Sequence, residues 1–216
     1  MQRARFISLE GGEGCGKSTQ AKLLAETLKA KGIDVILTRE PGGEEGAEAI
    51  RELLVKGKPE RWDPVAETLL FLASRTQHVE RVIKPALAKG TWVISDRFHD
   101  STRVYQGVGK GVSDAYYRQL HAATLGNFMP DLTFLLDIPP EIGLIRAHGR
   151  RDGETRFESM KLDFDDACAP VSLTIAEAES SRFHIIDAEA DVPYIHRAIV
   201  KDMNMRFDLS LTAAHA

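Results

Sequence analysis

Ten consecutive residues near the start of the chain have the types and spacing needed to bind a polyphosphate. The segment 10–19 matches the pattern G-x-x-x-x-G-K-[ST], with its fixed positions held by Gly11, Gly16, Lys17 and Ser18. Consecutive backbone N–H groups can turn inward around phosphate oxygens where glycine relieves the clash of a Cβ atom. In such a loop the lysine ammonium contacts the outer phosphates, and the serine hydroxyl can ligate Mg²⁺.

The segments on both sides of this loop support the prediction. Residues 6–9 form a short apolar run typical of a buried strand, and apolar residues at 21, 24, 25 and 28 follow helical spacing. Strand, loop and helix in this order place the helix N-terminus beneath the phosphates. We therefore expect the nucleotide to bind at Gly11, Gly12, Glu13, Gly14, Cys15, Gly16, Lys17, Ser18 and Thr19.

A second pair of residues that could bind a metal ion and phosphate follows the apolar run 92–95. Asp96 at the end of a strand can hold Mg²⁺ directly or through water, as the second acidic element of phosphate-loop enzymes does. Arg97 beside it could bridge two phosphate groups, since a guanidinium matches phosphate oxygens in pairs. The alternative is a surface salt bridge at a strand end, and the phosphate loop makes the functional interpretation the stronger one.

A basic segment at about residues 146–158 could form a short lid over ATP. It contains four arginines, and glycines at 149 and 153 could serve as hinges. A solvated charged face is the alternative for any such run. The arginines are Arg146, Arg150, Arg151 and Arg156.

One aromatic and one basic residue share a predicted helix face. Phe71 and Arg75 are four residues apart, so a ring and a guanidinium could together bind a nucleobase. The same spacing also occurs in ordinary helix packing, and by itself it is a weak signal.

The length and composition of the chain fit one globular domain. It has 216 residues, of which 43% are hydrophobic and 28% are charged. No stretch approaches the roughly 18 apolar residues of a membrane span. A net charge of −4 argues against a broad surface for nucleic acid, and two cysteines are too few for a disulfide framework. We expect a cytoplasmic protein with neither a membrane nor a nucleic-acid partner.

Five apolar runs predict strands, and helical periodicity separates them. The strands are expected at 6–9, 33–38, 92–95, 132–137 and 183–187. This alternation predicts an α/β fold in which helices cover both faces of a five-stranded parallel sheet. Ligands then bind at the carboxyl ends of the strands. The residues at or just after these ends are Glu10, Arg39, Asp96, Arg97 and Asp137.

The helices carry several interruptions. The longest periodic segment, 65–88, contains Pro85, which predicts a kink or break near its end. Pro170 is expected to interrupt a helix in the 160–175 region, and residues 101–111 form a glycine-punctuated segment. Residues 1–208 form the expected single domain, and residues 209–216 are expected to be a flexible tail.

Taken together, these residues resemble one family closely, the bacterial thymidylate kinases. The resemblance runs from about residue 6 to residue 203 and includes the phosphate loop and Asp96-Arg97. The string Thr38-Arg39-Glu40-Pro41-Gly42-Gly43 is its most specific part. Ser101-Thr102, Tyr105-Gln106-Gly107, the segment 130–133 and Arg-Phe-Glu at 156–158 add to it.

The resemblance implies a P-loop NTPase fold, ATP and Mg²⁺ as cofactors, and transfer of the ATP γ-phosphoryl group to dTMP on the route to dTTP. It also implies a homodimer. Because the loop carries Glu13 where related enzymes have an arginine, it places the catalytic arginines in the lid, at Arg150, Arg151 and Arg156. With them, Lys17, Asp96 and Arg97 are the expected catalytic residues.

The family also implies the acceptor site. Phe71 would stack on thymine, Arg75 would hydrogen-bond its O4, and Thr102 would face its polar edge. Tyr105 would exclude a ribose 2′-hydroxyl, Glu13 would lie near the 3′-hydroxyl, and Arg97 would bind the dTMP phosphate. Arg39, Pro41 and Gln106 complete the expected acceptor residues, and Ser18 with Asp96 would hold the metal ion.

Three features depart from the family pattern, and two other functions remain open. Phe98 replaces a common tyrosine, Glu44 a usual threonine, and Ser172 lies about where a tyrosine is often found. Within enzymes, the acceptor could be another nucleoside monophosphate or a deoxynucleoside. From another class, the chain could be a nucleotide-binding sensor or a regulatory ATPase that uses no acceptor.

Overall fold

Five parallel strands form the sheet around which the chain is built. The computed structural model describes residues 3–147 and 162–213, and the strand order is β2-β3-β1-β4-β5. The strands are β1 (Phe6–Gly11), β2 (Val35–Arg39), β3 (Trp92–Asp96), β4 (Leu132–Asp137) and β5 (Phe183–Asp187). The predicted α/β class and five-stranded parallel sheet are therefore confirmed.

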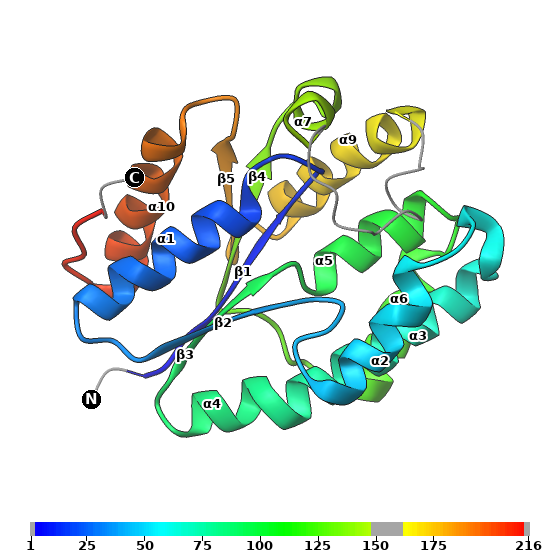
Figure 1. Cartoon of the computed structure of the whole chain (residues 1–216), viewed down its shortest axis with the longest axis horizontal. Coiled ribbons are helices and arrows are strands. Elements are labelled where there is room, and N and C mark those ends of the chain that lie inside the picture. Colours follow the sequence, from blue (N-terminus) through cyan, green and yellow to red (C-terminus); the bar gives the residue numbers. More distant parts are fainter. Residues whose placement is uncertain (1–2, 148–161, 214–216) are drawn as a thin grey trace.

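Helices cover both faces of this sheet, as Figure 1 shows. One face carries α1 (Lys17–Ala30) and α10 (Val192–Phe207); the other carries α3 (Pro64–His78), α4 (Lys84–Ala88), α6 (Asp114–Leu125) and α9 (Leu162–Ala178). The shorter elements are α2 (Glu45–Val55), α5 (His99–Thr102), α7 (Pro140–Ala147), a 3₁₀ turn (Pro59–Arg61) and two π-helical segments (Val79–Ile83 and Arg103–Val108).

Alternation along β1 separates the two halves of the core. Ile7 and Leu9 pack with α1 and α10, whereas Phe6 packs with Val79 and Phe98 on the opposite face. Successive side chains of a strand point to opposite faces, so Ser8 and Glu10 share the face of Phe6. This alternation directs the Glu10 carboxylate toward the segment that follows β3.

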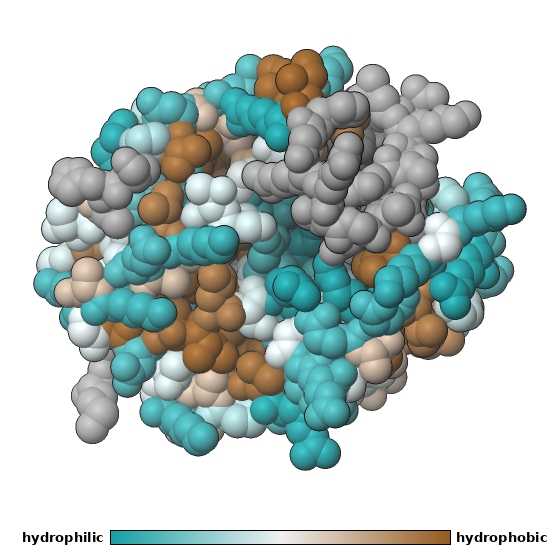
Figure 2. All heavy atoms as spheres, in the orientation of Figure 1, coloured by the Kyte–Doolittle hydropathy of each residue, from teal (hydrophilic) through white to brown (hydrophobic). Residues whose placement is uncertain are grey.

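The register of the sheet brings together the strand-end residues expected in the site. Leu9 of β1 lies beside Asp96 of β3, Asp96 lies beside Arg39 of β2, and Gly11 lies beside Leu136 of β4. The phosphate loop at the end of β1 is thus flanked by the carboxyl ends of β3 and β4. In the same orientation, Figure 2 shows a recess with hydrophilic residues near the middle of this face.

Prolines affect the two helical regions differently. Before Pro85 the helix changes from α to π geometry over Val79–Ile83, so the expected kink or break takes the form of a π-helical segment in a run of helix that continues to Ala88. The predicted interruption at Pro170 is wrong, because α9 continues through this residue. Ala176 of α9 packs with Leu135 and Phe183 of the sheet, and this burial outweighs the backbone hydrogen bond that proline cannot make.

One other prediction needs correction, and the glycine-punctuated segment has a defined structure. The glycine-punctuated segment 101–111 is mostly helical, since α5 and the second π-helical segment run through it to Val108. The residues expected to be a flexible tail pack on the core as far as residue 213. Asn204 exchanges two hydrogen bonds with the backbone of Leu211, whose side chain is 7% exposed. Residues 214–216 lie outside the described part.

Candidate active site

The phosphate loop is fixed by two close backbone approaches. Gly11 has a φ of 137°, and a Cβ there would lie 2.5 Å from the Leu136 carbonyl oxygen. Gly14 has a φ of 68°, and a Cβ there would lie 1.9 Å from the carbonyl oxygen of Gly143 in α7. Glycine is required at both positions, because any side chain would displace the loop from β4 or α7.

Lys17 begins α1 and turns its side chain back over the loop. Its Nζ donates to the carbonyl oxygens of Gly11 at 3.1 Å and Gly12 at 2.6 Å, and to Cys15 Sγ at 3.4 Å. The side chain is held inside the loop curve, with the residue only 7% exposed. The ammonium therefore lies where a polyphosphate wrapped by this loop would place its negative charge.

Ser18 and Asp96 come together from α1 and β3. Ser18 Oγ donates to Asp96 Oδ2 at 2.5 Å, although the two residues are 78 positions apart. A hydroxyl and a carboxylate oxygen, together with phosphate oxygens, suit Mg²⁺, which is commonly held by few protein ligands. Within residues 3–147 and 162–213, no group of three histidine, cysteine or carboxylate residues could hold a metal by itself.

Arg97 lies between the phosphate loop and the residues after β3. Its φ of 68° is in the left-handed region, which a non-glycine residue adopts at some cost. Its backbone N–H donates to Leu9 O, and its Nη1 donates to Gly11 O at 3.2 Å and Ser101 Oγ at 3.0 Å. The guanidinium lies 5.3 Å from the ring centroid of Tyr105. Although burial opposes its charge, nearby Tyr105, Asp96 and Glu10 raise the pKa of Arg97 above its ordinary value.

Glu10 is a buried carboxylate beside this arginine. It is 3% exposed; its Oε1 accepts from the Phe98 backbone N–H at 2.8 Å and its Oε2 from Ser101 Oγ at 2.5 Å. Burial, and then the charge of Asp100, raise the pKa of Glu10 to about 7, against the opposing effects of Ser101 and Arg97.

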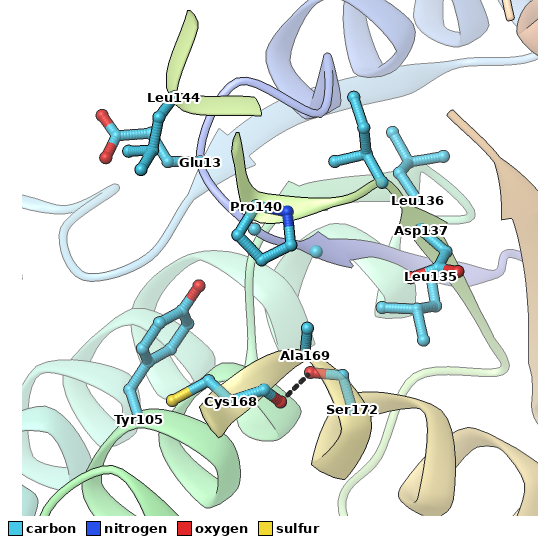
Figure 3. Close-up of a pocket in the computed structure, with 13 residues that line it drawn as sticks. Glu13, Tyr105, Leu135, Leu136, Asp137, Pro140, Leu144, Cys168, Ala169 and Ser172 are labelled. Atoms are coloured by element: carbon cyan, nitrogen blue, oxygen red, sulfur yellow. Dashed lines mark hydrogen bonds between the residues drawn. The ribbon is translucent and has the colours of Figure 1, made fainter. Parts of the chain in front are cut away.

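A pocket opens between the phosphate loop, the end of β4 and helix α9. Figure 3 shows Glu13 and Tyr105 on one side of it and Leu135, Leu136 and Asp137 on the other. Small residues of α9, among them Cys168, Ala169 and Ser172, form another wall. The structure thus brings together Glu13 and Tyr105, for which the family resemblance implies contacts with the sugar of the acceptor.

Arg75 forms the centre of a buried polar cluster. The residue is 2% exposed; Nε donates to Glu40 Oε2 at 2.6 Å and Nη1 to the Tyr117 hydroxyl at 3.0 Å. Its Nη2 donates to Phe98 O at 3.0 Å and to Thr102 Oγ1 at 2.9 Å. A guanidinium has five N–H groups, so these four bonds leave one N–H on Nη1 for a ligand.

Two buried histidines, His99 and His121, lie beside Tyr117 of this cluster. His99 Nδ1 lies 3.0 Å from the Tyr117 hydroxyl and 3.2 Å from His121 Nδ1. Burial lowers the pKa of His99 well below its usual range, and burial with Arg75 lowers the pKa of His121 to about 4. Both imidazoles are neutral near pH 7, which avoids placing further positive charge beside Arg75.

Some residues predicted for the site face other partners. Arg39 Nη2 donates to Glu48 at 3.1 Å, Pro41 accepts from Arg51, and Gln106 Nε2 donates to Glu67 at 2.8 Å. Phe71 is buried, at 8% exposed. Arg146 donates to the carbonyl oxygens of Ala188 and Glu189. The expected lid residues Arg150, Arg151 and Arg156 lie outside the described residues.

Three residues that organise the site carry no sequence signal for this role. In the sequence Glu10 is marked only as a strand-end residue and Glu40 only as part of the Thr-Arg-Glu-Pro-Gly-Gly string, and no motif contains Tyr117. Glu40 bonds both Arg75 and His78, the latter at 2.9 Å. An acid between Arg39 and Pro41 gives no sequence signal that its carboxylate is buried, since the partners are 35 and 38 residues away.

Comparison with known proteins identifies the family of this chain. The family model described as thymidylate kinase matches residues 9–199. A thymidylate kinase of Caulobacter vibrioides is 52% identical over 199 residues, with 92% of this chain and 95% of that protein covered. One from Dinoroseobacter shibae is 53% identical over 194 residues, with 88% and 93% covered.

A solved structure shows the same architecture. The crystal structure of thymidylate kinase from Ehrlichia chaffeensis aligns with a TM-score of 0.75 at 33% identity, covering 94% of this chain and 99% of that one. It supports the P-loop NTPase fold that the family resemblance implies. With the family model, the sequence relatives and the fold in agreement, this chain belongs to the thymidylate kinase family of nucleoside monophosphate kinases.

Proposed function

We propose that this thymidylate kinase transfers the γ-phosphoryl group of ATP directly to the phosphate of dTMP, in line and without a covalent enzyme intermediate. The observation that carries this proposal is the position of Arg97, whose guanidinium contacts both the phosphate loop and the acceptor-side residue Ser101. Positioning and charge stabilisation supply most of the catalysis of such a transfer. The Arg97 guanidinium, between the sites for the ATP and dTMP phosphates, would supply both the positioning and the charge stabilisation.

Residues 11–19 would bind the ATP phosphates. The loop N–H groups and the N-terminus of α1 would face the phosphate oxygens, and Lys17 would contact the β- and γ-phosphates. Its present bonds to loop carbonyl oxygens already hold its ammonium over the loop. Arg150, Arg151 and Arg156 remain the proposed catalytic arginines of the basic lid.

Ser18 and Asp96 would hold Mg²⁺ between them and the nucleotide. Their oxygens are already within hydrogen-bond distance, so they converge on one place beside the loop. When bound, the ion would neutralise phosphate charge and orient the terminal phosphate.

The buried cluster around Arg75 would recognise the base. Its single remaining N–H matches one acceptor such as thymine O4, and Phe71 lies one helical turn away for stacking. Thr102 would face the polar edge of the base while its hydroxyl accepts from Arg75.

The sugar would lie in the pocket shown in Figure 3. Tyr105 would exclude a ribose 2′-hydroxyl and Glu13 would approach the 3′-hydroxyl, since both residues line this pocket. For Arg39, Pro41 and Gln106 we propose a role in shaping the acceptor site, through the residues that they contact.

Offering acceptors separately tests this proposal. With Mg·ATP we expect ADP release to be fast with dTMP, and weaker by about 10- to 200-fold with dUMP, which lacks only the methyl group. Turnover with dCMP, dGMP, AMP or thymidine should be weaker still, and EDTA in place of Mg²⁺ should stop the reaction. A different preferred monophosphate would contradict the base-site roles. ADP release that ignores the acceptor would favour the regulatory ATPase.

We further propose a homodimer, located in the cytoplasm. Apolar side chains on α2 and α3 support the dimer, since Leu53, Val65 and Leu69 are 39%, 37% and 46% exposed. Two buried cysteine thiols, Cys15 and Cys168, fit a reducing compartment. None of the helices among the described residues is long and apolar enough to cross a membrane. Light scattering during gel filtration should give twice the chain mass of 23.9 kDa; a monomer would contradict the dimer.

A further inference from the structure

Glu10 is connected to the proposed phosphate-binding arginine through one hydroxyl group. Ser101 Oγ donates to Glu10 Oε2 at 2.5 Å and accepts from Arg97 Nη1 at 3.0 Å. A hydroxyl has one donor and two acceptor sites, so an ionised Glu10 fixes the direction in which Ser101 presents its lone pairs. The order of bonds is therefore carboxylate, hydroxyl, guanidinium.

The second oxygen of Glu10 controls the backbone beside Arg97. Glu10 Oε1 accepts from the N–H of Phe98 at 2.8 Å, immediately after the left-handed residue. A residue in that conformation persists only when its surroundings hold it. Glu10 thus holds Arg97 in two ways, through its guanidinium and through the following peptide.

Glu10 is buried where an unpaired carboxylate would be costly. It lies at the end of β1, on the face of Phe6 and Ser8, and also lines a pocket with Asp100, Tyr105 and Ser172. A buried charge needs partners, and among the described residues the hydrogen-bond partners of Glu10 belong to the segment that carries Arg97. A residue needed only for packing on this face of β1 would be apolar, as Phe6 is.

We infer that Glu10 is a positioning residue for phosphate transfer, which fixes Arg97 through Ser101 and thereby sets the affinity for the acceptor phosphate. This inference rests on the proposed contact between Arg97 and the phosphate of dTMP. In this role Glu10 acts through Ser101 and the Phe98 peptide and needs no contact with either substrate. We assign its effect to the acceptor and not to ATP, because Ser101 belongs to α5 and lies outside the loop residues 11–19 that would bind ATP.

The variant Glu10→Gln tests this with little change in volume. The amide can still accept from Phe98, but its NH₂ group donates to Ser101 where the carboxylate accepted, which reverses one hydrogen bond. We expect the KM for dTMP to rise on the order of 10- to 100-fold, with the KM for ATP nearly unchanged. Ser101→Ala should give the same pattern without altering the buried acid.

The double variant separates a shared path from two separate defects. If Glu10 acts through Ser101, combining Glu10→Gln with Ser101→Ala should cost little more than the worse single variant. Additive effects on the KM for dTMP would overturn the inference. Asp202→Asn is the matched control, since Asp202 of α10 is also buried, at 7% exposed, and pairs with His184 away from the site.

The pH profile gives a readout that packing alone would not move. The charged and titratable groups facing Glu10 are Arg97 and Asp100 after β3, Tyr105 beyond them, and Arg75 from α3. With its pKa near 7, Glu10 becomes protonated as the pH falls through neutrality, and its new O–H competes with Arg97 for Ser101. The kcat/KM for dTMP should therefore fall below pH 7 in the unmodified enzyme more steeply than in Glu10→Gln.

Ionisation of the dTMP phosphate affects the unmodified enzyme and Glu10→Gln equally, so it does not contribute to the difference between their pH profiles. Identical pH profiles, or an unchanged KM for dTMP in both Glu10→Gln and Ser101→Ala, would overturn the inference. The proposed role of Arg97 is tested independently by Arg97→Ala. If that variant keeps its KM and kcat, the phosphate contact itself is wrong; if it loses activity while Glu10→Gln does not, only the inference about Glu10 is wrong.

Discussion

Replacing Arg97 with alanine is expected to lower kcat/KM for dTMP on the order of 10³-fold or more. The guanidinium bonds both Gly11 of the phosphate loop and Ser101 of α5, so in the proposed role it would neutralise charge on the phosphates of ATP and dTMP. No other arginine among the described residues contacts a loop carbonyl oxygen in this way. Steady-state rates at saturating Mg·ATP with varied dTMP measure the loss.

The backbone at residue 97 does not confound this experiment. Arginine already adopts a φ of 68° there, and alanine pays a similar left-handed penalty, so the variant should fold. Arg97→Lys keeps the charge but loses the paired geometry, and we expect an intermediate loss. Arg118→Ala is the control, because Arg118 forms an exposed ion pair with Asp114 on α6 and should leave kcat/KM unchanged. Near-normal kinetics of Arg97→Ala would contradict the role.

The sheet was predictable from sequence because its signals are local. Apolar runs located all five strands, with the greatest difference at β2, which begins at Val35 and not at residue 33. The phosphate loop was equally visible, since its glycines, Lys17 and Ser18 are consecutive or nearly so. The order of the strands depends on contacts between distant segments, and no local pattern contains it.

The helical irregularities were less predictable. Pro170 lacks the N–H of a regular helix position, and only the packing of Ala176 against Leu135 and Phe183 shows why α9 continues. Likewise, the segment after Asp96 contains glycines typical of loops. It is helical because buried side chains, Thr102 and Val104 among them, tie it to the core.

The residues of the site also divide into those that a local sequence pattern marks and those that it does not. The residues proposed to bind the phosphates occur in short motifs, whereas the residues that hold those side chains in place come from distant positions. Glu10 meets Ser101 over 91 positions, and Arg75 meets Tyr117 over 42. Burial is what gives these contacts their strength, since the same groups in water would gain little from pairing. Sequence spacing contains no measure of that burial.

Lys17→Ala is expected to lower kcat on the order of 10²- to 10³-fold, a loss typical of removing one preorganised donor at developing charge. Lys17 Nζ lies against the carbonyl oxygens of Gly11 and Gly12, so ATP would meet an ammonium already in place. Without the ammonium, the loop N–H groups can still bind phosphate. The negative charge that develops as the γ-phosphoryl group leaves then lacks the stabilisation that Lys17 would provide.

This reasoning predicts a separation between binding and chemistry. Direct titration of Lys17→Ala with ATP should show weaker but measurable binding, while single-turnover transfer to dTMP should be slowed much more strongly. Lys22→Ala is the matched control, since Lys22 is exposed on the same helix and has no place in the loop. If Lys17→Ala lost ATP affinity alone and transferred normally at saturating ATP, Lys17 would hold the ground-state nucleotide only. An ammonium fixed over the loop by two carbonyl oxygens argues for the first result, because preorganisation acts on charge that forms during transfer.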